Sequence, residues 1–138
     1  MDFTTFICYS LKVTMKKIER HLTQRLEEFG LNFPKSLIIF CLLEKDGSSL
    51  SEIGQRAQIE NSSLTTMADR LEKDGFVIRK LDDQDRRMVR LFLTEKGRKS
   101  GEEILSEGIK FNNYLISQLN GQDQILVEAL ETIAKSMD

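Results

Sequence analysis

Two short helical patterns in tandem constrain the fold of this chain more than any other feature of its sequence. The first runs over Ser51–Ala57 and the second over about Asn61–Asp74, with only Gln58–Glu60 between them. In each segment the apolar residues recur with the spacing of one helix face. Because a link of three residues leaves no room for the helices to run antiparallel, the pair predicts a helix-turn-helix.

The second helix of this pair carries short hydrogen-bonding side chains on its polar face. That face consists of Asn61, Ser62, Thr65, Thr66, Asp69 and Arg70. Side chains of this kind suit base edges and phosphates. We expect Arg70 to contact phosphate, and we expect contacts to bases and to the DNA backbone from Asn61, Ser62, Ser63, Thr65 and Thr66. Capping of the helix is the alternative role for Ser62 and Ser63.

After Gly75 the apolar period changes from that of a helix to that of a strand. The segments Phe76–Leu81 and Met88–Leu93 predict a two-stranded hairpin. Its polar tip, Asp82–Arg87, is too charged to be buried. Thr94 then stands where the N-cap of a long helix to about Leu119 would lie.

Further helices are predicted on both sides of this region. An apolar stripe from Leu11 predicts a helix that ends at Gly30, Asn32 and Pro34 predict the start of a helix through Glu44, and a last helix is expected over Gln122–Met137. The fold class is therefore mainly α with a small β-hairpin, in one domain of residues 1–138. The terminal helices carry more apolar surface than so small a core can cover, which favours a homodimer.

Charge is unevenly distributed along the chain. The whole chain has a formal net charge of -2 and a pI near 5.6, which alone argues mildly against a nucleic-acid partner. From Arg70 to Arg98, however, nine basic residues face six acidic ones, for a net of +3, whereas Gly101–Asp138 has two against seven, for a net of -5. The basic charge thus gathers on the helix-turn-helix and hairpin, as expected for a surface that binds DNA.

Other classes of protein find little support in the sequence. No apolar run is long enough to span a membrane, and Met1–Tyr9 lacks the features of a signal peptide, so we expect a cytoplasmic protein. One His and two Cys are not spaced as a zinc site, and we expect no metal and no cofactor. The chain also lacks a Gly-rich phosphate loop and a nucleophile elbow, which argues against an enzyme.

The stretch from Leu50 to Gly97 resembles the winged helix-turn-helix core of MarR-type transcription regulators. The residues that carry the resemblance are DRLEKDGFVIRK, the hairpin DDQDRRMVRLFL and the closing LTEKG. The resemblance implies a DNA-binding core at about residues 34–98 and helical dimerisation regions at about 1–30 and 99–138. It also implies a homodimer that places two recognition helices in successive major grooves of a near-palindromic operator.

The resemblance further implies roles for the hairpin, which is the wing of such proteins. Asp85-Arg86-Arg87 matches the Asp-x-Arg of the family's wing tip, with Arg87 inserted in a minor groove, Asp85 holding it, and Arg86 on phosphate. Arg90 and Arg79 either hold the wing or touch phosphate. A winged-helix module that binds protein in place of DNA is a competing interpretation.

The resemblance also suggests how such a protein is switched. Family members typically repress until a small aromatic or phenolic ligand binds or a thiol is oxidised, although some activate. Cys8 resembles in position the reactive cysteine of the peroxide-sensing branch, but Leu22 and Phe33 occupy the places of the tyrosines expected there. A buried thiol in apolar surroundings is the alternative for Cys8, and Cys41 is expected in the core.

Overall fold

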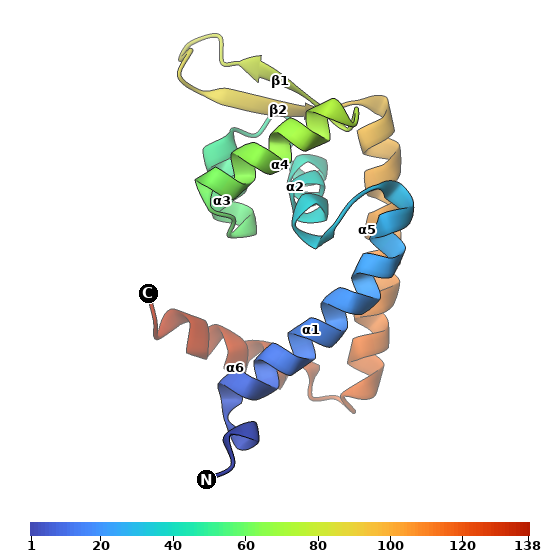
Figure 1. The fold of residues 1–138 in the computed structure, drawn as a ribbon, viewed down its shortest axis with the longest axis vertical. Helices are drawn as coiled ribbons and strands as arrows, with labels where there is room; N and C mark the ends of the chain where they lie inside the picture. Colours follow the sequence, from blue (N-terminus) through green and yellow to red (C-terminus); the bar gives the residue numbers. More distant parts are fainter. The chain divides into compact units, whose positions relative to one another are not determined.

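The computed structural model describes all residues from Met1 to Asp138 as a mostly helical chain with one β-hairpin (Figure 1). Its elements in chain order are the 3-10 turn η1 (Phe3–Thr5), α1 (Ile7–Leu26), the 3-10 turn η2 (Glu27–Phe29), α2 (Phe33–Glu44), α3 (Leu50–Ala57), α4 (Asn61–Lys73), β1 (Val77–Leu81), β2 (Val89–Leu93), α5 (Glu95–Gln118) and α6 (Asp123–Lys135). The chain forms two compact units, Met1–Ile104 and Leu105–Asp138. None of the helices combines the length and apolar character needed to cross a bilayer.

The core of the first unit is built around α2. Ile38, Ile39 and Leu42 of this helix are fully buried, and Cys41 is buried beside them. They pack with buried residues of the neighbouring elements, among them Ile53, Leu64, Leu71, Phe76 and Leu91. The stretch Leu37–Leu43 of α2 is apolar on all sides, and a helix of this kind has to be buried.

Local signals in the sequence set where the helices begin. The side chain of Asn32 accepts a hydrogen bond from the backbone N–H of Lys35 at 3.0 Å, with Pro34 in the first turn of α2. Ser49 and Glu52 form a capping box at α3, in which each side chain binds the other's backbone N–H. Thr94 caps α5 as predicted, since its hydroxyl accepts a hydrogen bond from Gly97 N–H at 3.0 Å.

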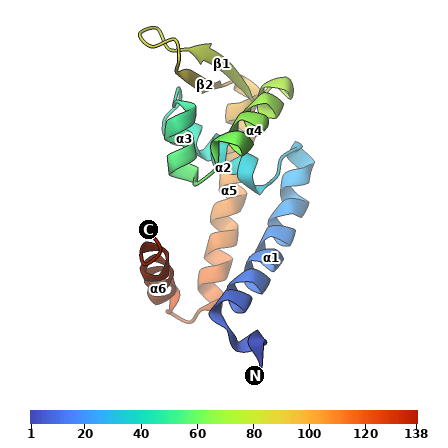
Figure 2. The same cartoon turned by 60° about the vertical axis from the view of Figure 1, so that its left-hand side comes forward.

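The hairpin is antiparallel, and its register pairs Val77 with Leu93 and Leu81 with Val89. The loop between α2 and α3 extends it on the β2 side. Leu91 N–H donates to the Ser48 carbonyl at 3.0 Å, Gly47 N–H donates to the Leu91 carbonyl at 3.0 Å, and Ser49 forms an isolated bridge with Arg90. Both views show the hairpin at one end of the first unit, next to α3 and α4 (Figures 1 and 2). The sequence did not predict the contribution of the loop.

The first long helix begins earlier than predicted. It starts at Ile7, not Leu11, and its expected last turn is the 3-10 turn η2, which Gly30 ends in the left-handed conformation. Ile7 lies four residues before Leu11 and continues the same apolar stripe, although Ile7–Ser10 are exposed. Along the predicted stripe, Leu26 is buried, whereas Leu11 and Met15 are exposed in the single chain.

The second unit contains the C-terminal part of α5, from Leu105, and α6. Asn120 and Gly121, both with positive φ, separate these helices as predicted. Large apolar side chains are exposed on both helices and just after α6, namely Leu105, Ile109, Tyr114, Ile116, Ile125, Leu126, Val127, Leu130 and Met137. So much exposed apolar surface is unusual for a monomer.

Candidate nucleic-acid interface

Helix α4 presents the polar face that its sequence predicts. Leu64, Ala68 and Leu71 are buried and fix the rotation of the helix against the core. All the residues expected on the outer face are exposed, that is Asn61, Ser62, Thr65, Thr66, Asp69 and Arg70, and Ser63 is exposed with them. The helix therefore carries a continuous row of hydrogen-bonding groups toward solvent.

The first turn of α4 is not closed by a side-chain cap. Glu60 is the N-cap residue and makes no capping hydrogen bond through its side chain, so Ser62 and Ser63 lie inside the helix and do not cap it. The hydroxyls of Thr65 and Thr66 donate to the backbone carbonyls of Asn61 at 3.0 Å and Ser62 at 3.2 Å. Each hydroxyl oxygen keeps lone pairs with which it can accept a further hydrogen bond.

Arg70 and Arg79 are both engaged with carboxylates, but to different degrees. Arg70 Nε lies 3.2 Å from Asp74 Oδ2 in an exposed pair, which costs little to exchange for a phosphate. Arg79 in β1 is half-buried and pairs with both Asp69 and Glu72 of α4. Its backbone N–H also donates to Glu72 Oε2 at 3.1 Å. Of the two roles open to Arg79, the geometry favours holding the wing against α4.

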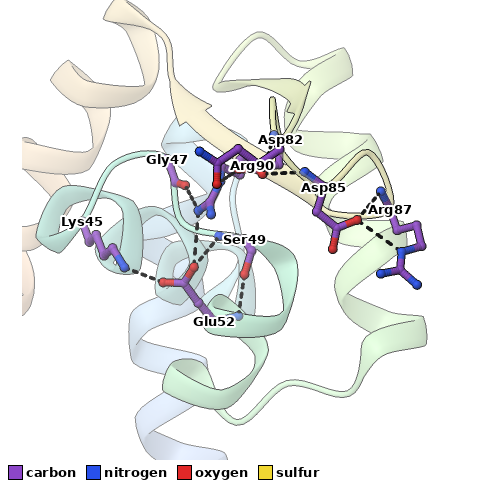
Figure 3. Close-up of polar contacts among 9 residues, drawn as sticks. Lys45, Gly47, Ser49, Glu52, Asp82, Asp85, Arg87 and Arg90 are labelled. Carbon is purple, nitrogen blue, oxygen red and sulfur yellow. Dashed lines mark hydrogen bonds and ion pairs between the residues drawn. The ribbon is translucent and has the colours of Figure 1, made fainter.

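At the wing tip, Asp82–Arg87, the carboxylate of Asp85 holds Arg87 (Figure 3). Asp85 Oδ1 accepts hydrogen bonds from the backbone N–H of Arg87 at 3.0 Å and from its Nε at 3.2 Å. The Arg87 side chain is nevertheless 93% exposed, and Arg86 beside it is exposed as well. An open cleft of about 410 Å³ separates Asp85 and Arg87 from the start of α3.

Arg90 occupies a different environment from the arginines of the wing tip. Its Nε donates to Asp82 Oδ1 at 2.7 Å, and its Nη1 donates to the Gly47 carbonyl at 3.0 Å and to Glu52 Oε1 at 3.4 Å. Lys45 Nζ lies 2.6 Å from the other oxygen of Glu52. Roles for Glu52, Lys45 and Asp82 were not predicted from the sequence, although the capping-box pattern Ser49-x-x-Glu52 is a local signal for Glu52.

These contacts lower the pKa of both carboxyl groups. Hydrogen bonds from Lys45 and from the backbone of Ser49 lower the pKa of Glu52 to about 2, from an ordinary value of 4.5. The Arg90 hydrogen bond is the main reason why the pKa of Asp82 also lies below its ordinary value. Both side chains therefore stay ionised, and paired with cations, at any physiological pH.

The two thiols differ in exposure. Cys41 is buried, as predicted, and burial raises the pKa of its thiol. Cys8 is exposed in the single chain, so the expectation of apolar surroundings that bury it is wrong for this structure. It lies in the first turn of α1, outside the residues that pack on the core. No group of three or more His, Cys, Asp or Glu side chains is arranged to hold a metal ion.

Comparison with known proteins assigns this chain to a family. A model of the MarR family matches residues 31–89. The HTH-type transcriptional regulator SarZ of Staphylococcus epidermidis is 30% identical over 135 residues, which cover 96% of this chain and 89% of that protein. The chain belongs to the MarR family. It is therefore a DNA-binding transcriptional regulator and not an enzyme, and the matched region contains α2, α3, α4 and most of the wing.

Two further proteins are similar to this chain, one in sequence and one in structure. The HTH-type transcriptional repressor MdtR of Bacillus subtilis is 36% identical over 98 residues, which cover 70% of this chain and 63% of that protein. A crystal structure of overoxidized AbfR bound to DNA has a TM-score of 0.79 and 26% identity, with 96% of this chain and 92% of that chain covered. The winged helix-turn-helix fold expected from the sequence is confirmed.

Proposed function

We propose that this MarR-family chain acts as a homodimeric repressor that binds a near-palindromic operator and is released by a small molecule. The observation that carries the proposal is the exposed polar face of α4 beside the exposed Arg87 of the wing, in a fold similar to that of DNA-bound AbfR. The name of MdtR, a repressor, supports repression. A small aromatic or phenolic compound is the effector class that we propose.

The proposed contacts divide between the two elements. In the major groove, α4 offers its uncapped first turn and the side chains of Asn61, Ser62, Ser63, Thr65 and Thr66, with Arg70 on phosphate. In the minor groove, the wing offers Arg87 on its Asp85 support, and Arg86 lies beside it for phosphate. Insertion of an arginine reads the width and potential of that groove more than its sequence.

The exposed apolar residues support the homodimer. They lie on α1, where Leu11 and Met15 are examples, and throughout the second unit, where Ile125 is 68% exposed. A second copy can cover surfaces of this kind by two-fold symmetry. Such a dimer would carry two copies of α4, for half-sites about one DNA turn, roughly 34 Å, apart.

A thiol switch is a second candidate for release from the operator. Exposure of Cys8 favours it, and similarity to AbfR, of which an overoxidized form exists, supports a response of this chain to oxidation. Leu22 and Phe33 supply no hydroxyl that could activate the thiol at the places where the peroxide-sensing branch has tyrosines. Peroxide should release wild-type protein, but not the Cys8→Ser variant, from DNA if the thiol is the sensor.

Selection of bound fragments from a random DNA pool, followed by fluorescence anisotropy at several salt concentrations, tests the proposal. The selected motif should be near-palindromic. Arg87→Ala should weaken binding and reduce the slope of log affinity against log salt by about 0.9 for each Arg87, so by about 1.8 for the dimer.

The control is Lys110→Ala, which removes the same charge in the second unit and should leave the slope unchanged. An unchanged slope for Arg87→Ala would refute the assignment of the wing. Failure of the wild-type protein to enrich any DNA motif would refute the proposed function and would favour the protein-binding alternative.

A further inference from the structure

Arg90 differs from the arginines at the wing tip in exposure and in the elements that it joins. Its side chain is 29% exposed, against 93% for Arg87. Its guanidinium binds Asp82 in the wing tip, the carbonyl of Gly47 in the loop after α2, and Glu52 in α3. A side chain that bridges three elements is placed to fix their geometry, and here the element that it fixes is the wing.

Asp82 carries this connection into the wing tip. Its Oδ1 accepts from Arg90, whereas its Oδ2 accepts from the backbone N–H groups of Gln84 at 3.1 Å and Asp85 at 2.9 Å. Asp85 in turn holds both the backbone and the side chain of Arg87. One continuous series of hydrogen bonds therefore runs from α3 to Arg87 (Figure 3).

The other end of the series is firmly anchored. Glu52 belongs to the capping box of α3 and is also paired with Lys45 at the end of α2. Because the neighbouring Ile53 is fully buried, α3 is fixed in the core, and the Glu52 side chain extends from that fixed helix. Through these contacts, the position of Arg87 is fixed relative to the same helices that orient α4.

We propose that Arg90 and Asp82 are positioning residues that hold Arg87 in the pose in which the wing meets DNA, and that Arg90 does not itself contact phosphate. The proposal rests on the proposed function, since it requires that Arg87 binds DNA. The sequence left two roles open for Arg90, namely holding the wing and touching phosphate. The proposal selects the first and excludes direct contact with phosphate. Two of the three guanidinium nitrogens of Arg90 are already bound within the protein.

Asp82→Asn gives the sharpest test, because electrostatics and positioning predict opposite results. Removing a negative charge from a DNA-facing loop strengthens binding if only charge matters. If Asp82 positions the wing tip, the substitution weakens binding, by about fivefold for two partly exposed pairs in a dimer. The matched control is Asp83→Asn, which removes the same charge from the adjacent exposed residue and should leave affinity equal or slightly higher.

A double-mutant cycle separates positioning from a general effect on folding. Arg90→Gln is measured by anisotropy on the selected operator, both in the wild-type background and with Arg87→Ala. Positioning predicts that Arg90→Gln weakens binding in the wild-type background but causes no further loss, in affinity or in salt slope, once Arg87 is absent. A folding defect would weaken binding equally in both backgrounds.

Three outcomes would overturn the role of Arg90. Asp82→Asn could tighten binding as Asp83→Asn does, the effects of Arg90→Gln and Arg87→Ala could simply add, or Arg90→Gln could lower the salt slope further in the double variant. Each leaves the proposed function intact as long as the wild-type protein binds its operator. Failure of the wild-type protein to bind DNA would instead overturn both proposals.

Discussion

Gly97→Ala is expected to destabilise the protein where the wing joins α5. Gly97 lies in the first turn of α5, and a Cβ added there would overlap the backbone carbonyl oxygen of Phe76 and lie 3.2 Å from Leu93 Cδ2. The carbonyl can move away only if the start of β1 moves with it. That oxygen also accepts hydrogen bonds from the backbone N–H of Thr94 at 3.0 Å and from its hydroxyl at 3.2 Å.

The expected loss can be worked out from these contacts. Overpacking of a tight site costs about 1–3 kcal/mol, and two weakened hydrogen bonds cost about 1 kcal/mol each. Replacing a helical glycine by alanine returns about 1 kcal/mol. The free energy of unfolding should therefore fall by about 2–4 kcal/mol.

Urea denaturation followed by circular dichroism measures this change, at one protein concentration for all variants because association adds to apparent stability. Lys99→Ala, at an exposed position of the same helix, is the control and should change the free energy of unfolding by no more than about 0.5 kcal/mol. If Gly97→Ala is as stable as the wild-type protein, the Phe76 carbonyl does not confine this turn and the reasoning is wrong.

Two other predictions concern acid stability and association. The pKa of Glu52 is about 2 in the folded chain and near 4.5 when unfolded, so its contacts contribute stability above about pH 4.5 that is lost as the pH falls toward 2. Glu52→Gln should flatten the fall in unfolding free energy over that range, and an unchanged acid-unfolding curve would contradict this. Ile125→Asp should dissociate the proposed dimer in sedimentation equilibrium. Ile125 is exposed in the single chain, so the substitution leaves the core of that chain intact. A measured mass that remains that of a dimer would exclude α6 from the interface.

Much of the fold was predictable because its signals are local. The turn between α3 and α4, the change of period after Gly75, and the caps at Asn32 and Thr94 each depend on a few neighbouring residues. The outer face of α4 followed from the same reasoning, since burying Leu64 and its helical neighbours forces the polar residues outward. These elements carry most of the candidate site.

The parts that could not be predicted depend on contacts between distant residues. Nothing near Arg90 in the sequence indicates that its guanidinium meets Gly47 and Glu52, about 40 residues earlier in the chain. The early start of α1 is a different case, because Ile7 lies four residues before Leu11 and continues its apolar stripe, so this start was predictable from the sequence.

Fewer positive charges are available for DNA than the count of basic residues suggests, and those that are available lie at exposed positions. The excess of +3 between Arg70 and Arg98 treats every arginine alike, yet Arg79 is paired with α4 and Arg90 with α3 and the wing tip. In the hairpin register these two side chains lie on opposite faces, because Arg79 pairs with Leu91 whereas Arg90 pairs with Lys80. The wing is therefore held from both faces by arginines whose charge is neutralised within the protein, and Arg86 and Arg87 remain as the exposed positive charges at its tip.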